Sequence, residues 1–170
     1  MRLIYRSAAL AAATLSLLVL AACDPQRISE LKEGVSTEAD VRDRFGAPEN
    51  VWDEPGGART FEYNRQPAGQ VNYMITIGPD GRMTALRQVL TSKTFARVSP
   101  GMRMDEVRRL LGKPAKVTPY ELKKETWADW RYLEAPNQSK VFTVVYGPDQ
   151  FVLRTQTGAD TEAPEFKGGK

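Results

Sequence analysis

The sequence predicts an α+β fold built from two tandem units. Each unit is expected to hold one or two short helices packed on a three- to four-stranded antiparallel sheet, with the two sheets either separate or joined into one continuous sheet. An internal repeat is the first observation behind this fold. Gly46-Ala47-Pro48 and Gly112-Lys113-Pro114 lie 66 positions apart, and Gly78-Pro79-Asp80 and Gly147-Pro148-Asp149 lie 69 positions apart. Matches that recur in the same order indicate a duplication. The second observation is that a helical pattern precedes alternating strands in both copies.

The repeat also sets the expected boundaries. We expect the first unit at residues 29–91 and the second at residues 95–157. Residues 158–170 are rich in glycine and charged residues, which predicts a disordered tail. Residues 1–22 are expected to be a signal peptide, and residues 23–28 a lipidated anchor and linker, for reasons given below.

The first helix is expected to begin after Thr37 and to end before Gly46. Thr37 and Asp40 are spaced as a capping box, in which each side chain accepts a backbone hydrogen bond from the other residue. Val41 and Phe45 then lie four positions apart on one face. Glycine suits the position after a helix, and Pro48 prevents continuation.

The second helix follows the same plan with a weaker start. Val107 and Leu110 lie on one face, and Gly112 and Pro114 end the helix as in the first copy. The capping position falls on Arg103, whose side chain cannot accept a backbone hydrogen bond. We therefore expect a less well capped N-terminus.

Strands follow each helix. Apolar and polar residues alternate over Val71–Ile77, Gly78–Gly81 is typical of a tight turn, and Met83–Leu90 is expected to return as the partner strand. The second copy repeats this hairpin over 141–155. Earlier strands are expected near residues 49–53, 60–65, 116–120 and 126–133.

The N-terminus has the pattern of a secretory address. Two arginines within residues 1–6 precede an apolar run from Ala8 to Leu20. This run is shorter than the roughly 20 residues that a membrane-spanning helix needs, and it suits a signal peptide. The following Leu20-Ala21-Ala22-Cys23 resembles the lipobox of bacterial lipoproteins. The resemblance implies cleavage between Ala22 and Cys23, diacylglycerol on the Cys23 sulfur, and a fatty acyl group such as palmitate on the Cys23 amine.

Acyl chains on Cys23 would anchor the mature protein to a membrane without spanning it. The expected location is the bacterial envelope, with the protein facing the periplasm, and the outer membrane is favoured. Asp24 directly follows Cys23. An aspartate at this position resembles an inner-membrane retention signal of enteric bacteria, so the inner membrane stays an alternative.

The composition excludes several classes of function. The chain contains no histidine and one cysteine, so it cannot form a histidine-dependent triad, a histidine-ligated zinc site or an internal disulfide. Its net charge of +3 falls to +1 without the two arginines of the signal peptide, which argues against nucleic-acid binding through phosphates. No pair of carboxylates stands out from ordinary surface charge. We therefore expect a binding protein rather than an enzyme, with no catalytic residue, metal or cofactor.

Two motifs resemble the BamE/SmpA family of small bacterial lipoproteins. The second copy carries a Gly-Met…Val…Gly-x-Pro motif, and the first copy carries a looser version that ends at Gly46 and Pro48. The first copy also contains an aromatic-Arg-Gln-Pro-x-Gly stretch over Phe61–Gly69. The residues of the second-copy motif are Gly101, Met102, Val107, Gly112 and Pro114.

The resemblance implies helices packed on an antiparallel sheet and a non-catalytic role in the outer-membrane β-barrel assembly machinery. It also implies contact with barrel-assembly subunits and with anionic phospholipid. That family usually has a single unit, whereas this chain has two. Tandem units of a helix and four strands resemble the β-lactamase-inhibitor-protein architecture, in which two units share a sheet with a concave binding face.

The loop after the second strand of the first copy is a candidate contact surface. Phe61, Tyr63 and Arg65 precede the turn that contains Gln66 and Pro67. Aromatic residues and arginine dominate interface energetics. The alternative is a hairpin whose Phe61 and Tyr63 share one face and lie in the core.

A second candidate surface contains Trp130 and Tyr132, which share one face of their strand, whereas Trp127 falls on the other face. One face of this strand is therefore expected to present an aromatic side chain to solvent or to a partner. Packing of the aromatic residues within the core is the alternative.

Together these features predict a lipid-anchored periplasmic scaffold or binding protein that assists β-barrel assembly and envelope integrity. Its expected partners are barrel-assembly subunits or another periplasmic protein, the membrane through Cys23, and anionic phospholipid, with no nucleic acid. One alternative is an inhibitor or protein-binding module that uses a concave sheet. Another is a structural envelope lipoprotein without a fixed partner.

Overall fold

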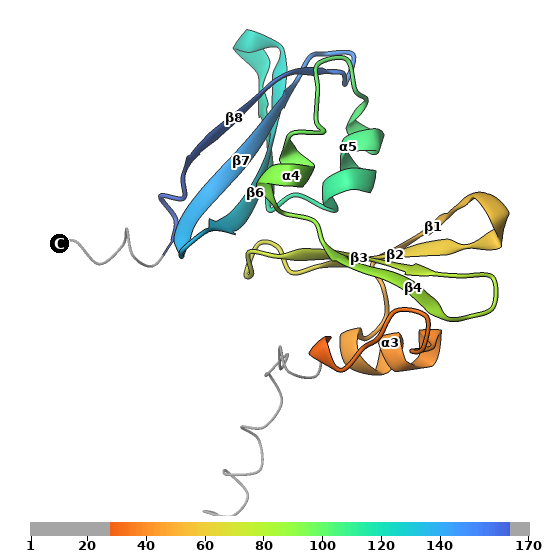
Figure 1. The fold of residues 1–170 in the computed structure, drawn as a ribbon. Helices are drawn as coiled ribbons and strands as arrows, with labels where there is room; N and C mark the ends of the chain where they lie inside the picture. Colours follow the sequence, from red (N-terminus) through yellow and green to blue (C-terminus); the bar gives the residue numbers. More distant parts are fainter. Residues whose placement is uncertain (1–27, 164–170) are drawn as a thin grey trace, which may run out of the picture.

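A computed structural model describes residues 28–163 (Figure 1). The first unit consists of α3 (Glu38–Phe45), β1 (Asn50–Asp53), the short 3-10 helix η1 (Pro55–Gly57), β2 (Arg59–Asn64), β3 (Asn72–Ile77) and β4 (Met83–Gln88). The second unit consists of α4 (Ser92–Phe95), α5 (Met104–Leu111), β5 (Lys116–Tyr120), the 3-10 helix η2 (Glu121–Lys123), β6 (Glu125–Glu134), β7 (Gln138–Tyr146) and β8 (Val152–Ala159).

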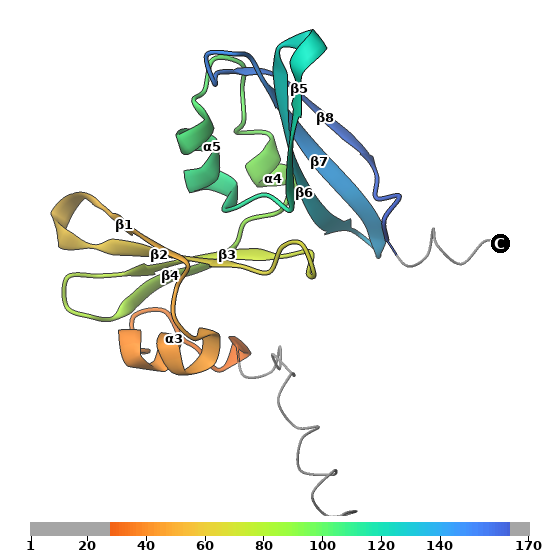
Figure 2. The same cartoon turned by 180° about the vertical axis from the view of Figure 1, so that it is seen from behind.

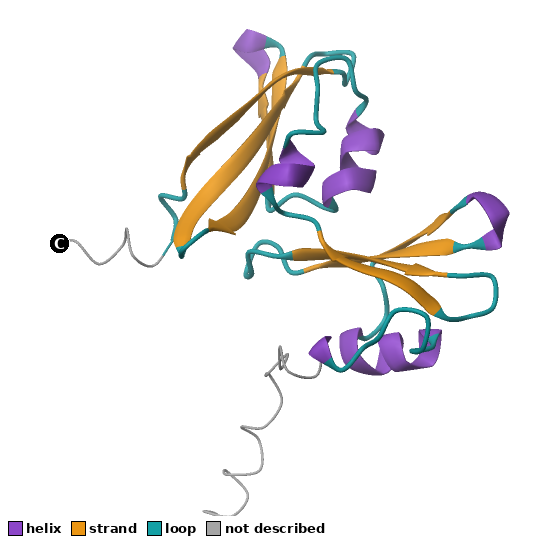
Figure 3. Ribbon diagram, in the orientation of Figure 1, coloured by secondary structure: helices purple, strands orange, loops and turns teal. Residues whose placement is uncertain are grey.

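The two sheets are separate. β1–β4 form one antiparallel sheet in sequence order, here called the first sheet, and β5–β8 form the second sheet in the same way. This confirms the expected α+β fold of two tandem units, but the option of one continuous sheet is wrong. Helices α4 and α5 lie between the two sheets, so the layers run α3, first sheet, α4 with α5, second sheet (Figures 2 and 3).

The C-terminal boundary differs from the expectation. β8 continues to Ala159, and Asp160 and Ala163 are buried, so the ordered chain passes the expected tail boundary at residue 158. An ion pair of 2.6 Å between Asp160 and Arg131 of β6 explains the difference. Ala22, Cys23 and Asp24 lie outside the described residues, and within 28–163 no helix has the length and apolarity needed to cross a membrane.

Helix α3 is capped at both ends. The Asp40 amide donates to the Thr37 hydroxyl over 3.3 Å, and the Asp40 carboxylate accepts from the Thr37 amide over 2.8 Å. At the other end, Gly46 adopts a φ of 83° and its amide donates to the Arg42 carbonyl, and the chain then turns toward Pro48 and β1. A positive φ favours glycine, because other L-residues meet a steric penalty there.

Helix α5 has only half of a capping box. The Arg103 amide donates to the Glu106 carboxylate over 2.7 Å. The neighbouring Met104 amide donates to the Gln150 carbonyl in the β7–β8 turn, as the Glu38 amide at the start of α3 donates to the Gly81 carbonyl in the β3–β4 turn. Gly112 ends the helix with a φ of 75°, and a Cβ there would come within 2.5 Å of the Asn64 side chain. Glycine is therefore required where the chain leaves α5 toward Pro114 and meets the first sheet.

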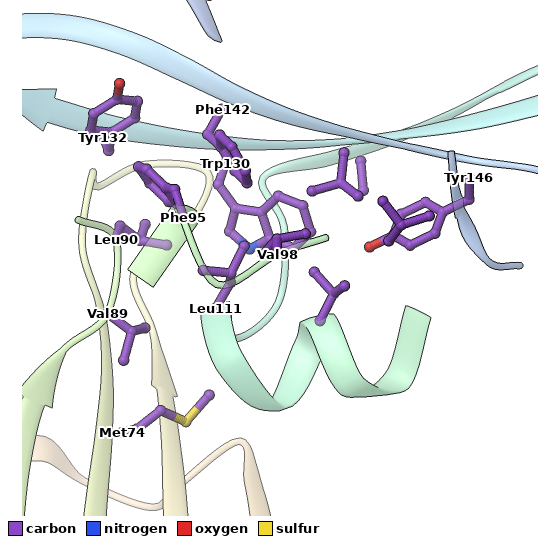
Figure 4. Packing of buried hydrophobic residues seen from close by; sticks show 14 residues of the cluster. Met74, Val89, Leu90, Phe95, Val98, Leu111, Trp130, Tyr132, Phe142 and Tyr146 are labelled. Carbon is purple, nitrogen blue, oxygen red and sulfur yellow. The ribbon is translucent and has the colours of Figure 1, made fainter. Parts of the chain in front are cut away.

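Each unit has its own hydrophobic core. The first core lies between α3 and one face of the first sheet, and the second lies between α4, α5 and the second sheet. In the second core, Phe95 stacks on Phe142 with ring centroids 4.2 Å apart and meets Tyr132 edge-on (Figure 4). Met74 and Val89 of the first unit join this core. The two units thus share apolar packing.

Four aromatic residues that were candidates for partner binding belong to these cores. Phe61 and Tyr63 are 0% and 2% exposed under α3, and Trp130 and Tyr132 are 1% and 2% exposed under α4 and α5. This corrects the expectation that they face a partner. Alternation along a strand sorts residues between two faces, but the helices decide which face is covered.

Candidate functional site

The Arg65–Pro67 loop joins the two units. The Gln66 side-chain amide donates to the Arg131 carbonyl over 2.8 Å and accepts from the Arg131 amide over 3.2 Å. The Arg131 guanidinium also donates to the Pro67 carbonyl over 2.9 Å. Arg65 lies over the Phe45 ring, 5.8 Å from its centroid. The polar groups of the loop therefore make their contacts within the chain.

Gly101 and Met102 of the resemblance motif also have structural positions. Gly101 has a φ of 87°, and its amide donates to the Val152 carbonyl over 2.9 Å. The Val152 amide donates in turn to the Met102 carbonyl over 2.8 Å. This pair of bonds fixes the segment before α5 onto β8.

A buried polar joint, made by Glu62 and Asn72, connects the first sheet to the end of α5. Both side chains are 0% exposed. The Asn72 side chain donates to the Leu111 carbonyl over 2.8 Å and to the Lys113 carbonyl over 3.1 Å. The Glu62 carboxylate accepts from the Lys113 amide over 3.0 Å and pairs with Arg108 at 3.4 Å. The joint thus satisfies carbonyls that the end of a helix leaves without partners.

Sequence reasoning did not find this joint. Asn72 was expected on the polar face of a half-buried strand, and that face is instead covered by the second unit. The signal in the sequence was limited to two polar residues, Glu62 and Asn72, within strands of the first unit. Their partners at the end of α5 lie in the second copy, so only the docking of the two units in space shows what these residues bind.

A cleft of about 830 Å³ opens between the units beside the polar joint. One wall is the first sheet, with Thr60 of β2, Thr76 of β3 and Arg87 of β4. The opposite wall is formed by α4, the residues after it, and α5. We call this hollow the inter-unit cleft. Its full lining is Glu54, Thr60, Met74, Thr76, Arg87, Gln88, Val89, Thr91, Lys93, Thr94, Arg97, Arg109 and Leu110.

Exposed apolar side chains gather at one end of the second sheet, where η2 and the β7–β8 turn lie together. Leu122, at the tip of η2, is 104% exposed, and Tyr120 and Leu153 are 39% and 47% exposed. The two hairpin ends are neighbours, because Tyr120 and Pro148 line one shallow pocket. We call this surface, with Trp127 and Phe151, the sheet tip.

An aromatic pair with cations around it lies on the outer face at the sheet tip. The Trp127 and Tyr120 ring centroids are 4.8 Å apart. The Lys123 ammonium lies 5.4 Å from the Trp127 ring centroid, and the Arg154 guanidinium lies 5.9 Å from it. Trp127 occupies the strand face opposite to Trp130, as alternation requires. Of the described helices, α4 and α5 cover only the inner face of this sheet (Figures 1 and 2).

Glu125 holds Arg154 and Trp127 in place. Both carboxylate oxygens accept from Arg154, over 2.7 Å and 3.0 Å, and one also accepts from the Trp127 indole N–H over 2.9 Å. These bonds, first from Arg154 and then from Trp127, lower the pKa of Glu125 to about 2. The Glu125 carboxylate therefore stays charged from neutral pH down to about pH 2 and keeps its bonds to Arg154 and Trp127 over that range.

Within residues 28–163, no group of three or more acidic, cysteine or histidine side chains is arranged to hold a metal ion. The candidate binding sites on the described surface are the inter-unit cleft and the sheet tip.

Comparisons with known proteins show no established family. No family model matches the chain, and no curated protein matches it. Two solved structures are similar over much of their length. A DUF4309 family protein, YjgB, from Bacillus subtilis has 23% identity and a TM-score of 0.31, covering 80% of this chain and 86% of that one. A protein from Streptococcus mutans, described as a candidate beta-lactamase inhibitor protein, has 11% identity and a TM-score of 0.34, covering 72% and 82%.

These findings correct the expected membership in the BamE/SmpA family. No model of any family matches, and the solved structures found belong to other groups of proteins. The short motifs behind that resemblance, such as Gly101 to Pro114, are explained by helix ends and by the contacts of α5 with β8 and the first sheet. Similar ends arise wherever a short helix stops and enters a strand.

The Glu125 contacts yield a pH prediction. We expect the Glu125 carboxyl to titrate with a midpoint near 2 in the wild-type protein and to move toward 4.5 in Arg154→Gln, because the main hydrogen-bond donor is lost. The pKa of Glu125 is lower in the folded protein than in the unfolded chain. Its carboxylate therefore stabilises the folded state fully above about pH 4.5, and this contribution is lost as the pH falls through about 2. The measurement is the carbon-13 shift of the Glu125 carboxyl against pH. Arg82→Gln, which removes an exposed pair with Asp80, serves as control and should leave the midpoint unchanged. A wild-type midpoint near 4.5 would contradict the contact.

Proposed function

We propose that this protein is a non-enzymatic binding module that recognises another protein through the sheet tip. The observation that carries the proposal is the gathering of exposed Tyr120, Leu122 and Leu153 beside the ordered Trp127. Single exposed apolar residues are ordinary on protein surfaces, but a contiguous group marks an interaction site.

The chemistry of the sheet tip suits a protein partner. Aromatic residues and arginine supply most of the binding energy at protein interfaces. Trp127 and Arg154 are held by Glu125 before any partner arrives, so little conformational entropy would be lost on binding. Apolar Leu122 lies beside the charged pair of Glu125 and Arg154, so the surface offers both apolar area to bury and charges that a complementary partner can meet.

A role in β-barrel assembly is not part of this proposal, because the family resemblance that implied it is corrected. An inhibitor is one form of protein-binding module and stays within the proposal. The binding face would not be a concave sheet that runs through both units, since the first and second sheets are separate.

The test is photocrosslinking in intact cells from a photoreactive residue at position 122, with position 35 as the matched control. Val35 is also exposed, at 62%, but lies in the first unit. We expect one protein to be captured from position 122 and not from position 35. Trp127→Ala should weaken that complex by roughly 30-fold, the effect of losing a central aromatic residue. The same adducts at both positions, or no adduct at position 122, would refute the proposed surface.

We also propose that the module is tethered to a membrane by acyl chains on Cys23, with the outer membrane favoured and Asp24 leaving the inner membrane as an alternative. The lipobox pattern of the sequence supports the tether. The described chain begins beside α3, at the opposite end of the molecule from η2 (Figures 1 and 2). A tether before residue 28 would therefore leave the sheet tip directed toward a partner away from the lipid surface.

Replacement of Cys23 tests the tether. We expect Cys23→Ser to move the protein from the membrane fraction to the soluble fraction, because the acyl chains supply most of the membrane affinity. Ser29→Ala, a nearby change that leaves the cysteine intact, should keep the protein on the membrane. Equal membrane fractions of the two variants, measured by quantitative blotting, would show that Cys23 is not the anchor.

A further inference from the structure

The inter-unit cleft is lined by four basic side chains and one acidic side chain. Arg87 of β4, Lys93 of α4, Arg97 just after α4, and Arg109 of α5 all line it. Among residues 28–163, none of the four forms an ion pair, although most other arginines do. Glu54 adds one carboxylate to the same lining. The cleft thus has an excess of cations gathered from both units.

One of these cations is held in position. The Arg109 guanidinium lies 4.8 Å from the centroid of the Trp52 ring. This stacking leaves the edges of the guanidinium, which carry its N–H donors, free for a ligand. Because Trp52 belongs to β1 and Arg109 to α5, the contact also links the two walls of the cleft.

Threonine hydroxyls add neutral donors on both walls. The Thr60 and Thr76 hydroxyls lie 3.3 Å apart on the sheet wall, and the Thr91 and Thr94 hydroxyls lie 3.1 Å apart on the helix wall. Two hydroxyls that share one hydrogen bond leave the second hydrogen for an outside acceptor. The cleft therefore presents donors from opposite directions.

We propose that the inter-unit cleft binds a phosphate ester. A carboxylate is planar and directs two oxygens to one side, whereas a phosphate group directs three acceptor oxygens in different directions and carries up to two negative charges. Donors on two facing walls fit the phosphate better. A volume of about 830 Å³ leaves room for further atoms of the ligand beside one phosphate group. Met74, Val89 and Leu110 supply an apolar surface for them.

The test uses inorganic pyrophosphate as the minimal probe, with binding to the protein followed by calorimetry at about 0.15 M salt, where diffuse attraction is screened. Arg87→Gln combined with Arg97→Gln should weaken binding at least about tenfold. The matched control combines Lys116→Gln with Lys124→Gln, which removes the same charge from exposed lysines that do not line the cleft and make no ion pair with residues 28–163. The control should change the dissociation constant by less than about twofold.

Two further probes identify the source of the phosphate. Vesicles of phosphatidylcholine with phosphatidylglycerol, compared with phosphatidylcholine alone, report on a lipid headgroup, and glycerol phosphate reports on a soluble ester. If the phosphatidylglycerol vesicles or glycerol phosphate bind and pyrophosphate competes with that binding, the proposal is supported and the source of the phosphate is identified. The proposal would be overturned if the two double variants lost equal affinity for pyrophosphate, or if pyrophosphate showed no saturable binding. Binding of a glutamate-rich peptide instead of pyrophosphate would also overturn it. Because these readouts do not involve the sheet tip, they stand apart from the crosslinking result.

Discussion

The buried joint made by Glu62 and Asn72 is the constraint on which the architecture depends. Both side chains are fully buried on a sheet face that would otherwise meet water. A buried carboxylate and amide are costly unless hydrogen-bonded, and here the end of α5 supplies the partners. The joint therefore selects one docking of the second unit on the first. Shared packing of Met74 and Val89 with the second core strengthens the same arrangement.

The positions of the two candidate sites follow from this docking. Because α3 covers one face of the first sheet and the second unit meets the other, the first sheet has little free surface. The contact between units is closest at the polar joint and opens beside it into the inter-unit cleft. The second sheet has helices on its inner face only, so Trp127 and its neighbours lie on an outer face without a helix cover.

Much of the fold could be predicted from the sequence, because its local signals are strong. The Thr37–Asp40 capping box and the glycines at 46 and 112 mark helix ends by short-range chemistry. The positions of Phe61 and Trp130 were harder to predict, since alternation tells which residues share a face and not what covers that face. The cleft cations, such as Arg87 and Arg109, are far apart in the sequence, and only the docking of the units brings them together.

We infer that the polar joint makes the two units one rigid body. Residual dipolar couplings of the backbone amides test it directly, because they report the orientation of each N–H bond in a common frame. We expect one alignment tensor to fit the couplings of both units, residues 38–88 and 92–159, in the docking shown in Figure 1. Two tensors of clearly different magnitude or orientation would show that the units move independently and that the joint does not hold them together.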